Sequence, residues 1–221
     1  MTGRIVVVTG TDTGVGKTLV TAALGRCLRD RGVRVVAVKP VESGVDGSEG
    51  EDGHLLAEAT GQGSPREALD RLKVPVAPPE AAEMEGLTLE PQRWLSAIRE
   101  LSLEHEVVLV EGAGSLLSPL TWETSLLDLA QDLNATAVVV GLDRLGVQGH
   151  TLLTIRALRD AGRDTLAVVL NAPEKPDAST ETNGRALTRV DPSIQIISVP
   201  RVGHWTEAVS HLAPLAEELR P

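Results

Sequence analysis

The stretch that decides the fold is V-T-G-T-D-T-G-V-G-K-T, residues 8–18, which ends an apolar strand pattern and opens a helical one. A strand, a glycine-rich loop and a helix in this order are typical of a phosphate-binding loop. Glycines let the backbone curl, so that several N–H groups point at phosphate oxygens, and the helix N-terminus adds the positive end of its dipole. Lys17 is then placed to reach the β- and γ-phosphates, and the Thr18 hydroxyl to ligate magnesium.

The loop departs from the strict pattern G-x-x-x-x-G-K-[ST], because Thr11 stands where the first glycine is required. Two other nucleotide loops fit less well. A dinucleotide fingerprint starting at Gly14 would need a small residue in place of Leu19 and an acidic residue at the end of the next strand, which ends in Lys39. A partition-type ATPase resembles this loop but carries a second lysine five residues before the main one, where this chain has Asp12.

Six short apolar runs rich in valine alternate with six segments of helical periodicity. Runs of this kind are typical of parallel strands that are buried on both faces. The predicted strands are 5–8, 33–38, 107–110, 135–140, 166–170 and 194–199, and the predicted helices are 17–31, 52–60, 91–103, 125–133, 147–161 and 205–219. We therefore expect an α/β fold of the P-loop NTPase type: an open, mostly parallel sheet with helices on both faces, formed by residues 1–221 as a single domain.

Three stretches are predicted to be irregular. Residues 44–53 are glycine-rich and acidic, residues 74–85 carry three prolines and are expected to bend over the sheet, and residues 172–183 are polar. In open α/β folds, ligands bind beyond the carboxyl ends of the strands, so each stretch is a candidate wall of a binding site. Solvated connections that bind nothing are the alternative.

The composition narrows the classes of function. The formal net charge is −10, and nucleic-acid binding needs a basic face, so we expect no nucleic-acid partner. The lack of Tyr and Phe excludes tyrosine chemistry and an RNA-stacking platform. The single cysteine excludes an intrachain disulfide. No stretch reaches the ~18 apolar residues of a membrane span, so we expect a cytoplasmic protein with no membrane partner.

Two further motifs follow predicted strands. Lys39 begins the run K-P-V-E-S-G at 39–44, where Pro40 stops the strand and Gly44 lets the chain turn away. At the carboxyl end of a neighbouring strand, Lys39 would face the same crevice as the phosphate loop and hold a phosphoryl group or a substrate anion. Glu111 follows another buried strand in V-E-G-A-G, residues 110–114, and is a candidate magnesium partner.

The sequence leaves two interpretations of Asp52 open. It begins a predicted helix, and aspartate is among the residues best suited to cap a helix N-terminus, which needs no ligand. Its carboxylate would alternatively be a magnesium ligand. Lys39 has a similar alternative, since a lysine at a sheet edge can direct its ammonium group into solvent. Zinc is not expected, because the five histidines show no ligand spacing.

Together, the phosphate loop at 10–18, K-P-V-x-S-G at 39–44 and V-E-G-A-G at 110–114 resemble the dethiobiotin synthetase family. Weaker matches run over most of the chain. They are the proline-rich segment at 75–82, the L-G…H helix start at 145–151, Asn171 at a strand end and Pro200 after the last strand. The resemblance implies a ligase of biotin synthesis that uses ATP and magnesium (Mg²⁺) to convert 7,8-diaminopelargonic acid and CO2 into dethiobiotin. It also implies a homodimer whose active sites lie at the interface.

The resemblance further implies the roles of the site residues. Those that would neutralise the carbamate and the transferring phosphate, or hydrogen-bond the diamine or carbamate, form the predicted catalytic and substrate set: Lys17, Lys39, Thr13 and Ser43. The predicted magnesium ligands are Thr18, Asp52 and Glu111. The residues predicted to contact ATP are Gly14, Val15, Gly16, Lys17, Thr18, Leu19, Asp52, Glu111, Gly112, Ala113, Gly114, Asn171, Ala172, Pro200, Arg201 and Val202.

Several positions depart from the family pattern, and two other functions stay open. The departures are Gly14, Ser115, Gly149 and Ala172. Ala172 stands where an acidic residue is frequent, which weakens the expectation that adenine is read strictly. A P-loop ATPase switch of the partition type, which would position a partner, is disfavoured by Asp12. A related amidoligase of cofactor synthesis would need an ammonia source, and we expect no glutaminase domain in 221 residues.

Overall fold

The computed structural model describes residues 2–47 and 50–220. A six-stranded sheet in the order β2-β5-β1-β6-β7-β8 runs through the molecule, and all neighbouring strands are parallel. Its strands are β1 (Arg4–Gly10), β2 (Val35–Val38), β5 (Val107–Ser115), β6 (Thr136–Leu142), β7 (Thr165–Asn171) and β8 (Ile196–Val199). The expected α/β fold is confirmed, with a main sheet that is parallel throughout. Because β1 lies inside the sheet, the phosphate loop emerges between the ends of β5 and β6.

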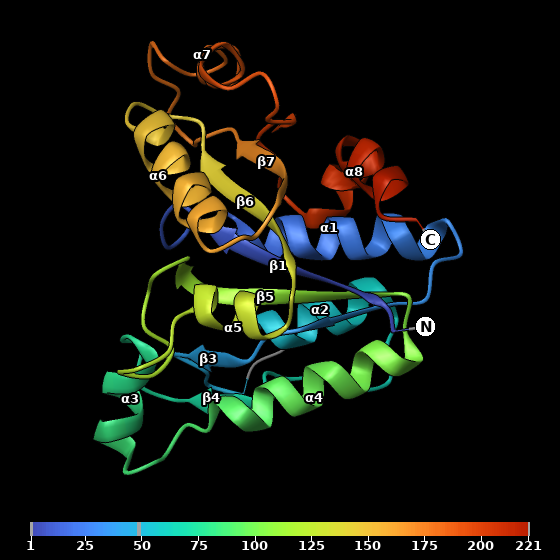
Figure 1. The fold of residues 1–221 in the computed structure, drawn as a ribbon, viewed down its shortest axis with the longest axis vertical. Coiled ribbons are helices and arrows are strands. Elements are labelled where there is room, and N and C mark those ends of the chain that lie inside the picture. The colour runs from blue at the N-terminus through green and yellow to red at the C-terminus, as the bar shows by residue number, and fades with distance from the viewer. Residues whose placement is uncertain (1, 48–49, 221) are drawn as a thin grey trace.

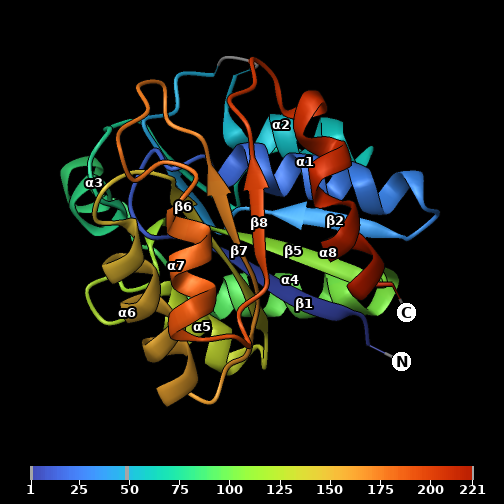
Figure 2. The same ribbon diagram turned by 90° about the horizontal axis from the view of Figure 1, so that it is seen from above.

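Helices cover both faces of this sheet (Figure 1). The helices on one face are α1 (Lys17–Asp30), α2 (Asp52–Thr60), η1 (Trp205–Leu212) and α8 (Ala213–Glu218). The helices on the other face are α4 (Pro91–Glu104), α5 (Leu126–Asp132), α6 (Val147–Asp160) and α7 (Asn183–Val190). The edge strands β2 and β8 point in clearly different directions in Figure 2, because a parallel sheet twists.

Successive residues of β1 face two separate hydrophobic cores. Val6 and Val8 pack on the α1 side, whereas Val7 packs on the α4 side. This alternation follows from the two-residue period of a strand. With no Phe or Tyr in the chain, branched aliphatic side chains and alanines make up most of both cores, together with Trp205 on the α1 side and Trp94 on the α4 side. The strands therefore have continuous valine-rich sequences.

The structure contains elements that the sequence periodicity does not predict. β3 (Val41–Ser43) and β4 (Asp70–Leu72) form a separate two-stranded parallel sheet. α3 (Pro78–Glu85) occupies much of the stretch 74–85, so the prediction of an irregular segment there is wrong. α7, with only eight residues, was not predicted either. Strands of three residues and helices of two turns are too short to show a reliable period.

The last predicted helix is also corrected. Residues 205–219 form the 3₁₀ helix η1 followed by the short helix α8, rather than one α-helix. Pro214 stands in the first turn of α8, and proline lacks the N–H group that would continue an α-helical ladder from η1. No helix in the portion that the structure describes is long and apolar enough to cross a membrane.

Candidate active site

The carboxyl ends of β1, β2 and β5 meet at a cavity of about 730 Å³. All three sequence motifs line it, so the structure brings them together as the parallel sheet predicts. Its lining residues are Thr13, Gly14, Gly16, Lys17, Thr18, Lys39, Glu42, Ser43, Asp52, Pro75, Val76, Ala77, Pro78, Glu111, Gly112, Ala113, Gly114, Ser118 and Pro119. Glu42, Ser118 and Pro119 are lining residues that the sequence did not single out.

The phosphate loop has the curled backbone that its glycines predict. Gly14 and Gly16 have φ values of 71° and 89°, a region that residues with a Cβ rarely adopt. Gly16 is the N-cap of α1 and makes no side-chain cap, so the first N–H groups of the helix have no helical acceptor and lie at the cavity. This is the arrangement that binds phosphate in other nucleotide sites.

Lys17 lies over this loop. Its Nζ donates to the backbone carbonyl of Asp12 at 3.2 Å. Burial lowers the pKa of Lys17 below its ordinary value, although the nearby carboxylate of Glu111 acts in the opposite direction. The ammonium group is therefore poorly compensated within the chain, and a phosphate oxygen would stabilise its charge.

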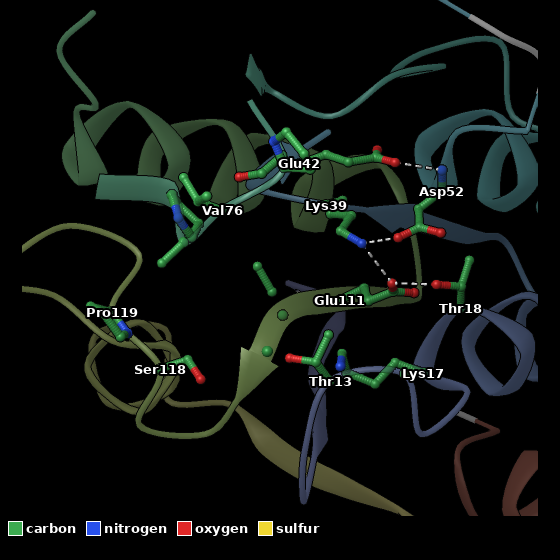
Figure 3. Close-up of a pocket in the computed structure, with 18 of the residues that line it drawn as sticks. Thr13, Lys17, Thr18, Lys39, Glu42, Asp52, Val76, Glu111, Ser118 and Pro119 are labelled. Atoms are coloured by element: carbon green, nitrogen blue, oxygen red, sulfur yellow. Dashed lines mark hydrogen bonds and ion pairs between the residues drawn. The ribbon is translucent and has the colours of Figure 1, made fainter. Parts of the chain in front are cut away.

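Glu111 is the centre of a charged cluster (Figure 3). Its side chain is 0% exposed, and Oε1 accepts hydrogen bonds from the Thr18 hydroxyl at 2.8 Å and from Lys39 Nζ at 3.1 Å. Lys39 also forms an ion pair with Asp52. Residues from α1, α2 and β5 and from the segment after β2 thus converge at one point.

Lys39 is buried in this cluster, with a side chain only 7% exposed, so the alternative of a solvent-directed lysine is wrong. Burial acts to lower the pKa of Lys39, but the carboxylates of Glu111 and Asp52 outweigh it, and the pKa lies above its ordinary value. The ammonium group therefore stays protonated. A buried ammonium held by two carboxylates is a fixed positive charge facing the phosphate loop.

The capping interpretation of Asp52 is also wrong. Its carboxylate faces Lys39, and the backbone N–H groups of Asp52 and Gly53 donate to Glu42 instead, at 2.7 and 3.2 Å. Glu42 occupies the undefined position of K-P-V-x-S-G and belongs to β3. Its partner lies ten residues further along the chain, and no local sequence pattern connects the two.

The donor set of the cluster fits a magnesium ion. Within the described residues, the Oε2 atom of Glu111 and the Oγ atom of Ser43 are buried without a hydrogen-bond partner. A buried carboxylate oxygen without a partner is costly. Carboxylate and hydroxyl oxygens from Glu111, Asp52 and Thr18 are the type of ligand that Mg²⁺ takes in proteins.

The residues predicted to contact ATP at and beyond the ends of β7 and β8, here termed the base side, lie beside the phosphate loop rather than in this cavity. The Asn171 side chain, at the end of β7, donates to the backbone carbonyl of Val15 at 2.8 Å, while its buried Oδ1 has no partner among the described residues. A Cβ at Gly16 would lie 2.5 Å from the Asn171 amide nitrogen, so the two segments are in close contact. In the free protein, Asn171 therefore supports the phosphate loop.

The other residues on this side have diverse surroundings. The Ala172 N–H donates to the Val199 carbonyl in the sheet edge, and Arg201 is exposed, 3.8 Å from Glu174. Pro200 is exposed as well. Two predicted nucleotide contacts, Leu19 and Val202, pack partly buried against the hydrophobic core of the α1 face. The phosphate-side predictions thus share one cavity, except for Leu19 and for Val15, which is buried in the core, whereas the base-side residues lie outside that cavity.

Comparisons with known proteins agree with this geometry. Residues 4–208 match a family model described as an AAA domain. The chain is 43% identical over 186 residues to the ATP-dependent dethiobiotin synthetase BioD of Anaeromyxobacter sp. (strain Fw109-5), with 83% of each chain covered. It is 35% identical over 195 residues to the Aquifex aeolicus (strain VF5) protein of the same name, with 88% of each covered. The chain belongs to the ATP-dependent dethiobiotin synthetase family. This membership confirms the resemblance that the three motifs carry.

Solved structures extend the likeness of fold beyond the dethiobiotin synthetase family. The cell division ATPase MinD of Pyrococcus furiosus aligns with a TM-score of 0.65 at 21% identity, over 99% of this chain and 100% of that chain. The septum site-determining protein MinD of Pyrococcus horikoshii OT3, complexed with Mg-ADP, also gives 0.65, at 19% identity over 99% and 96%. At these identities the likeness shows the fold alone, and it confirms the P-loop NTPase type.

Proposed function

We propose that this chain, acting as a single domain, converts 7,8-diaminopelargonic acid, CO2 and ATP into dethiobiotin, ADP and phosphate. The proposed active site is the cavity above β1, β2 and β5. The observation that carries the proposal is the convergence of Lys39, Asp52 and Glu111 beside the phosphate loop. In a member of the dethiobiotin synthetase family, this convergence supports a role for the buried cation and the two carboxylates in phosphoryl transfer.

The reaction has three balanced steps. One amine of the substrate adds to CO2 and loses a proton, which gives a carbamate. A carbamate oxygen attacks the γ-phosphorus of ATP, the bond to ADP breaks, and a carbamic–phosphoric anhydride forms. The second amine attacks the carbamate carbon and loses a proton, phosphate leaves, and the ureido ring closes.

Four residues would perform the chemistry in this scheme. Lys39 would stabilise the negative charge that the carbamate and the transferring phosphate share. Lys17 would hold the β- and γ-phosphates in both the ground state and the transition state. Thr13 and Ser43 line the same cavity and would hydrogen-bond the diamine or carbamate. Ser43 has a buried hydroxyl that lacks a partner among the described residues, which a substrate group would supply.

Thr18, Asp52 and Glu111 would hold magnesium, whose charge neutralises phosphate oxygens during the transfer. The unpartnered Glu111 Oε2 supports this assignment. Four groups of residues are proposed to contact the nucleotide: 14–19 at the phosphate loop and the start of α1, 111–114 in β5, 171–172 at the end of β7, and 200–202 after β8. Asn171 would reach the base by rearranging its present hydrogen bond to Val15.

We also propose that the chain works in the cytoplasm as a homodimer. Large apolar side chains are exposed on the segments that follow β5 and β6, as an interface requires; Leu145 is 82% exposed. The others on the adjoining segments are Leu117, Trp122 and Leu153. Oligomeric state measured by light scattering tests this, and a monomer at assay concentrations would contradict it.

The experiment that tests the function supplies carbon-labelled bicarbonate, the diamine and ATP to the purified protein. We expect the label in a cyclic urea, with ADP formed in equal amount, and incorporation of label about 10²–10³-fold slower with the Lys39→Ala variant. ATP hydrolysis without incorporation of label would instead support an ATPase switch. Incorporation of nitrogen from ammonia would support an amidoligase.

A further inference from the structure

The backbone N–H groups at the start of α2 are bound by a side chain from outside the helix. The first N–H groups of a helix find no acceptor within the helix, and acidic or hydroxyl side chains at its own start commonly bind them. Neither acidic residue at the start of α2 does so. The N-cap residue Glu51 makes no side-chain cap and instead binds Arg71 of β4 at 2.7 Å. The Asp52 carboxylate pairs with Lys39.

Glu42, which comes from β3, supplies the missing acceptors. Its Oε1 accepts the N–H of Asp52 at 2.7 Å (Figure 3). Its Oε2 accepts the N–H of Gly53 at 3.2 Å. Glu42 is 8% exposed, so water competes little for these bonds. Its negative charge also lies at the positive end of the helix dipole.

The other side of the helix start is fixed by close packing. A Cβ at Gly53 would lie 2.7 Å from the backbone nitrogen of Ala68, so the helix start lies directly against the segment before β4. With Glu42 on one side and this backbone on the other, the position of residue 52 is determined from two directions. The direction of the Asp52 side chain follows from that position.

We propose that Glu42 is a positioning residue of the active site. It caps α2 in place of Asp52 and thereby leaves the Asp52 carboxylate free to face Lys39. The inference rests on the proposed function, because it assigns Glu42 a role in the same cavity. Glu42 acts through Asp52 and makes no chemical contribution of its own.

A direct contact with the substrate is the competing explanation, since Glu42 also lines the cavity. A double-mutant cycle separates the two. We expect Glu42→Ala to lower kcat about tenfold, the loss of one well-placed hydrogen-bonding group, and to change kcat less than twofold when Asp52→Asn is already present. Equal effects in both backgrounds would show that Glu42 acts independently of Asp52 and would overturn the proposal.

Amide hydrogen exchange gives a readout that does not depend on catalysis. In the unliganded protein, the amides of Asp52 and Gly53 should exchange about tenfold faster in Glu42→Ala, because they lose their acceptors. Glu42→Gln keeps one acceptor oxygen and the side-chain size, so its exchange rates should lie between those of the unmutated protein and those of Glu42→Ala. It also tests the proposal if the alanine variant does not fold. Unchanged exchange in both variants would overturn the proposal.

Glu58→Gln is the matched control. Glu58 lies on the same helix and is exposed, and its substitution removes the same charge without touching the cap. It should leave kcat and both exchange rates unchanged. If the unmutated protein made no dethiobiotin, the proposed function would fail while the exchange experiment still tested the cap, so the two failures are distinguishable.

Discussion

Lys39, just after β2, and Glu111, within β5, are both buried, and the Lys39 Nζ atom lies 3.1 Å from Glu111 Oε1. At the ends of β7 and β8, by contrast, Asn171 donates its side-chain amide to the phosphate loop, and the Arg201 side chain is 62% exposed. Buried charges must be paired, so the phosphate side of the site is fixed before any ligand binds. The groups on the base side have other structural partners or face solvent. The comparison suggests that the chemistry depends on fixed charges and that base preference depends on groups that can rearrange.

Lys39→Ala should have the largest effect on the phosphate side. Removing a preorganised charge of this kind costs roughly 3–4 kcal/mol, or about 10²–10³ in turnover. ATP affinity should change less, because Lys39 mainly meets the carbamate and the transferring phosphate. Steady-state kinetics with a separate measurement of ATP binding checks both expectations.

Lys39→Arg is the companion variant. The planar guanidinium group is larger than an ammonium group and cannot take the same place between Glu111 and Asp52, so turnover should remain low. Near-normal turnover in either variant would make Lys39 a structural residue and would remove the contrast between the two sides of the site.

Lys17→Ala should affect ATP binding and turnover together. Lys17 lies on the loop that holds the triphosphate before the reaction, so we expect ATP affinity to fall about tenfold or more, as for a hydrogen bond to a charged group. Isothermal titration with a non-hydrolysable ATP analogue measures the binding change directly. Unchanged affinity combined with low turnover would give Lys17 the same role as Lys39.

Asn171→Ala sharpens the comparison on the base side. Loss of the amide should weaken nucleotide binding by about tenfold with a smaller change in turnover. If Asn171 reads the base, ATP should be weakened more than GTP or CTP. If it acts only by supporting Val15, all three should be weakened equally. Competition binding with the three nucleotides distinguishes these results, and unchanged binding of every nucleotide would contradict both.

Arg201→Ala should have the smallest effect. Its side chain is exposed and 3.8 Å from Glu174, and exposed ion pairs contribute at most about 1 kcal/mol. We expect the Michaelis constant for ATP to change less than about threefold on that basis. A change in the Michaelis constant as large as the effect of Asn171→Ala would show that the base side is more firmly organised than the structure without nucleotide indicates.

The same contrast explains what the sequence could predict. The phosphate loop, the valine-rich strands and the presence of Lys39 and Glu111 at one cavity follow from local order, because each motif lies at or near the carboxyl end of a buried strand and parallel strands end at one edge. The prediction that Asp52 is a magnesium ligand came from the resemblance to a known family, because the residues alone left its role open.

The remaining features depend on contacts between distant segments. The bond between Asn171 and Val15 joins residues 156 positions apart, and Glu42 caps a helix that starts ten positions later. No short sequence motif indicates either of these two contacts. β3, β4 and α3 escaped prediction because segments this short owe their form to packing rather than to a hydrophobic period. Within the stretch 44–53, which is predicted to be irregular, residues 48 and 49 lie outside the described residues.

The central claim is that the cavity activates a carbamate by phosphorylation. The most direct test is to measure whether an oxygen atom of CO2 is transferred to the released phosphate. The reaction is run with ¹⁸O-labelled bicarbonate, the diamine and ATP, and is stopped before the label exchanges with water. We predict that the released phosphate carries one labelled oxygen and that the ureido carbonyl of the product carries the other. Cyclic urea formed together with unlabelled phosphate would contradict the account, because it would show that no carbamate oxygen attacks the γ-phosphorus.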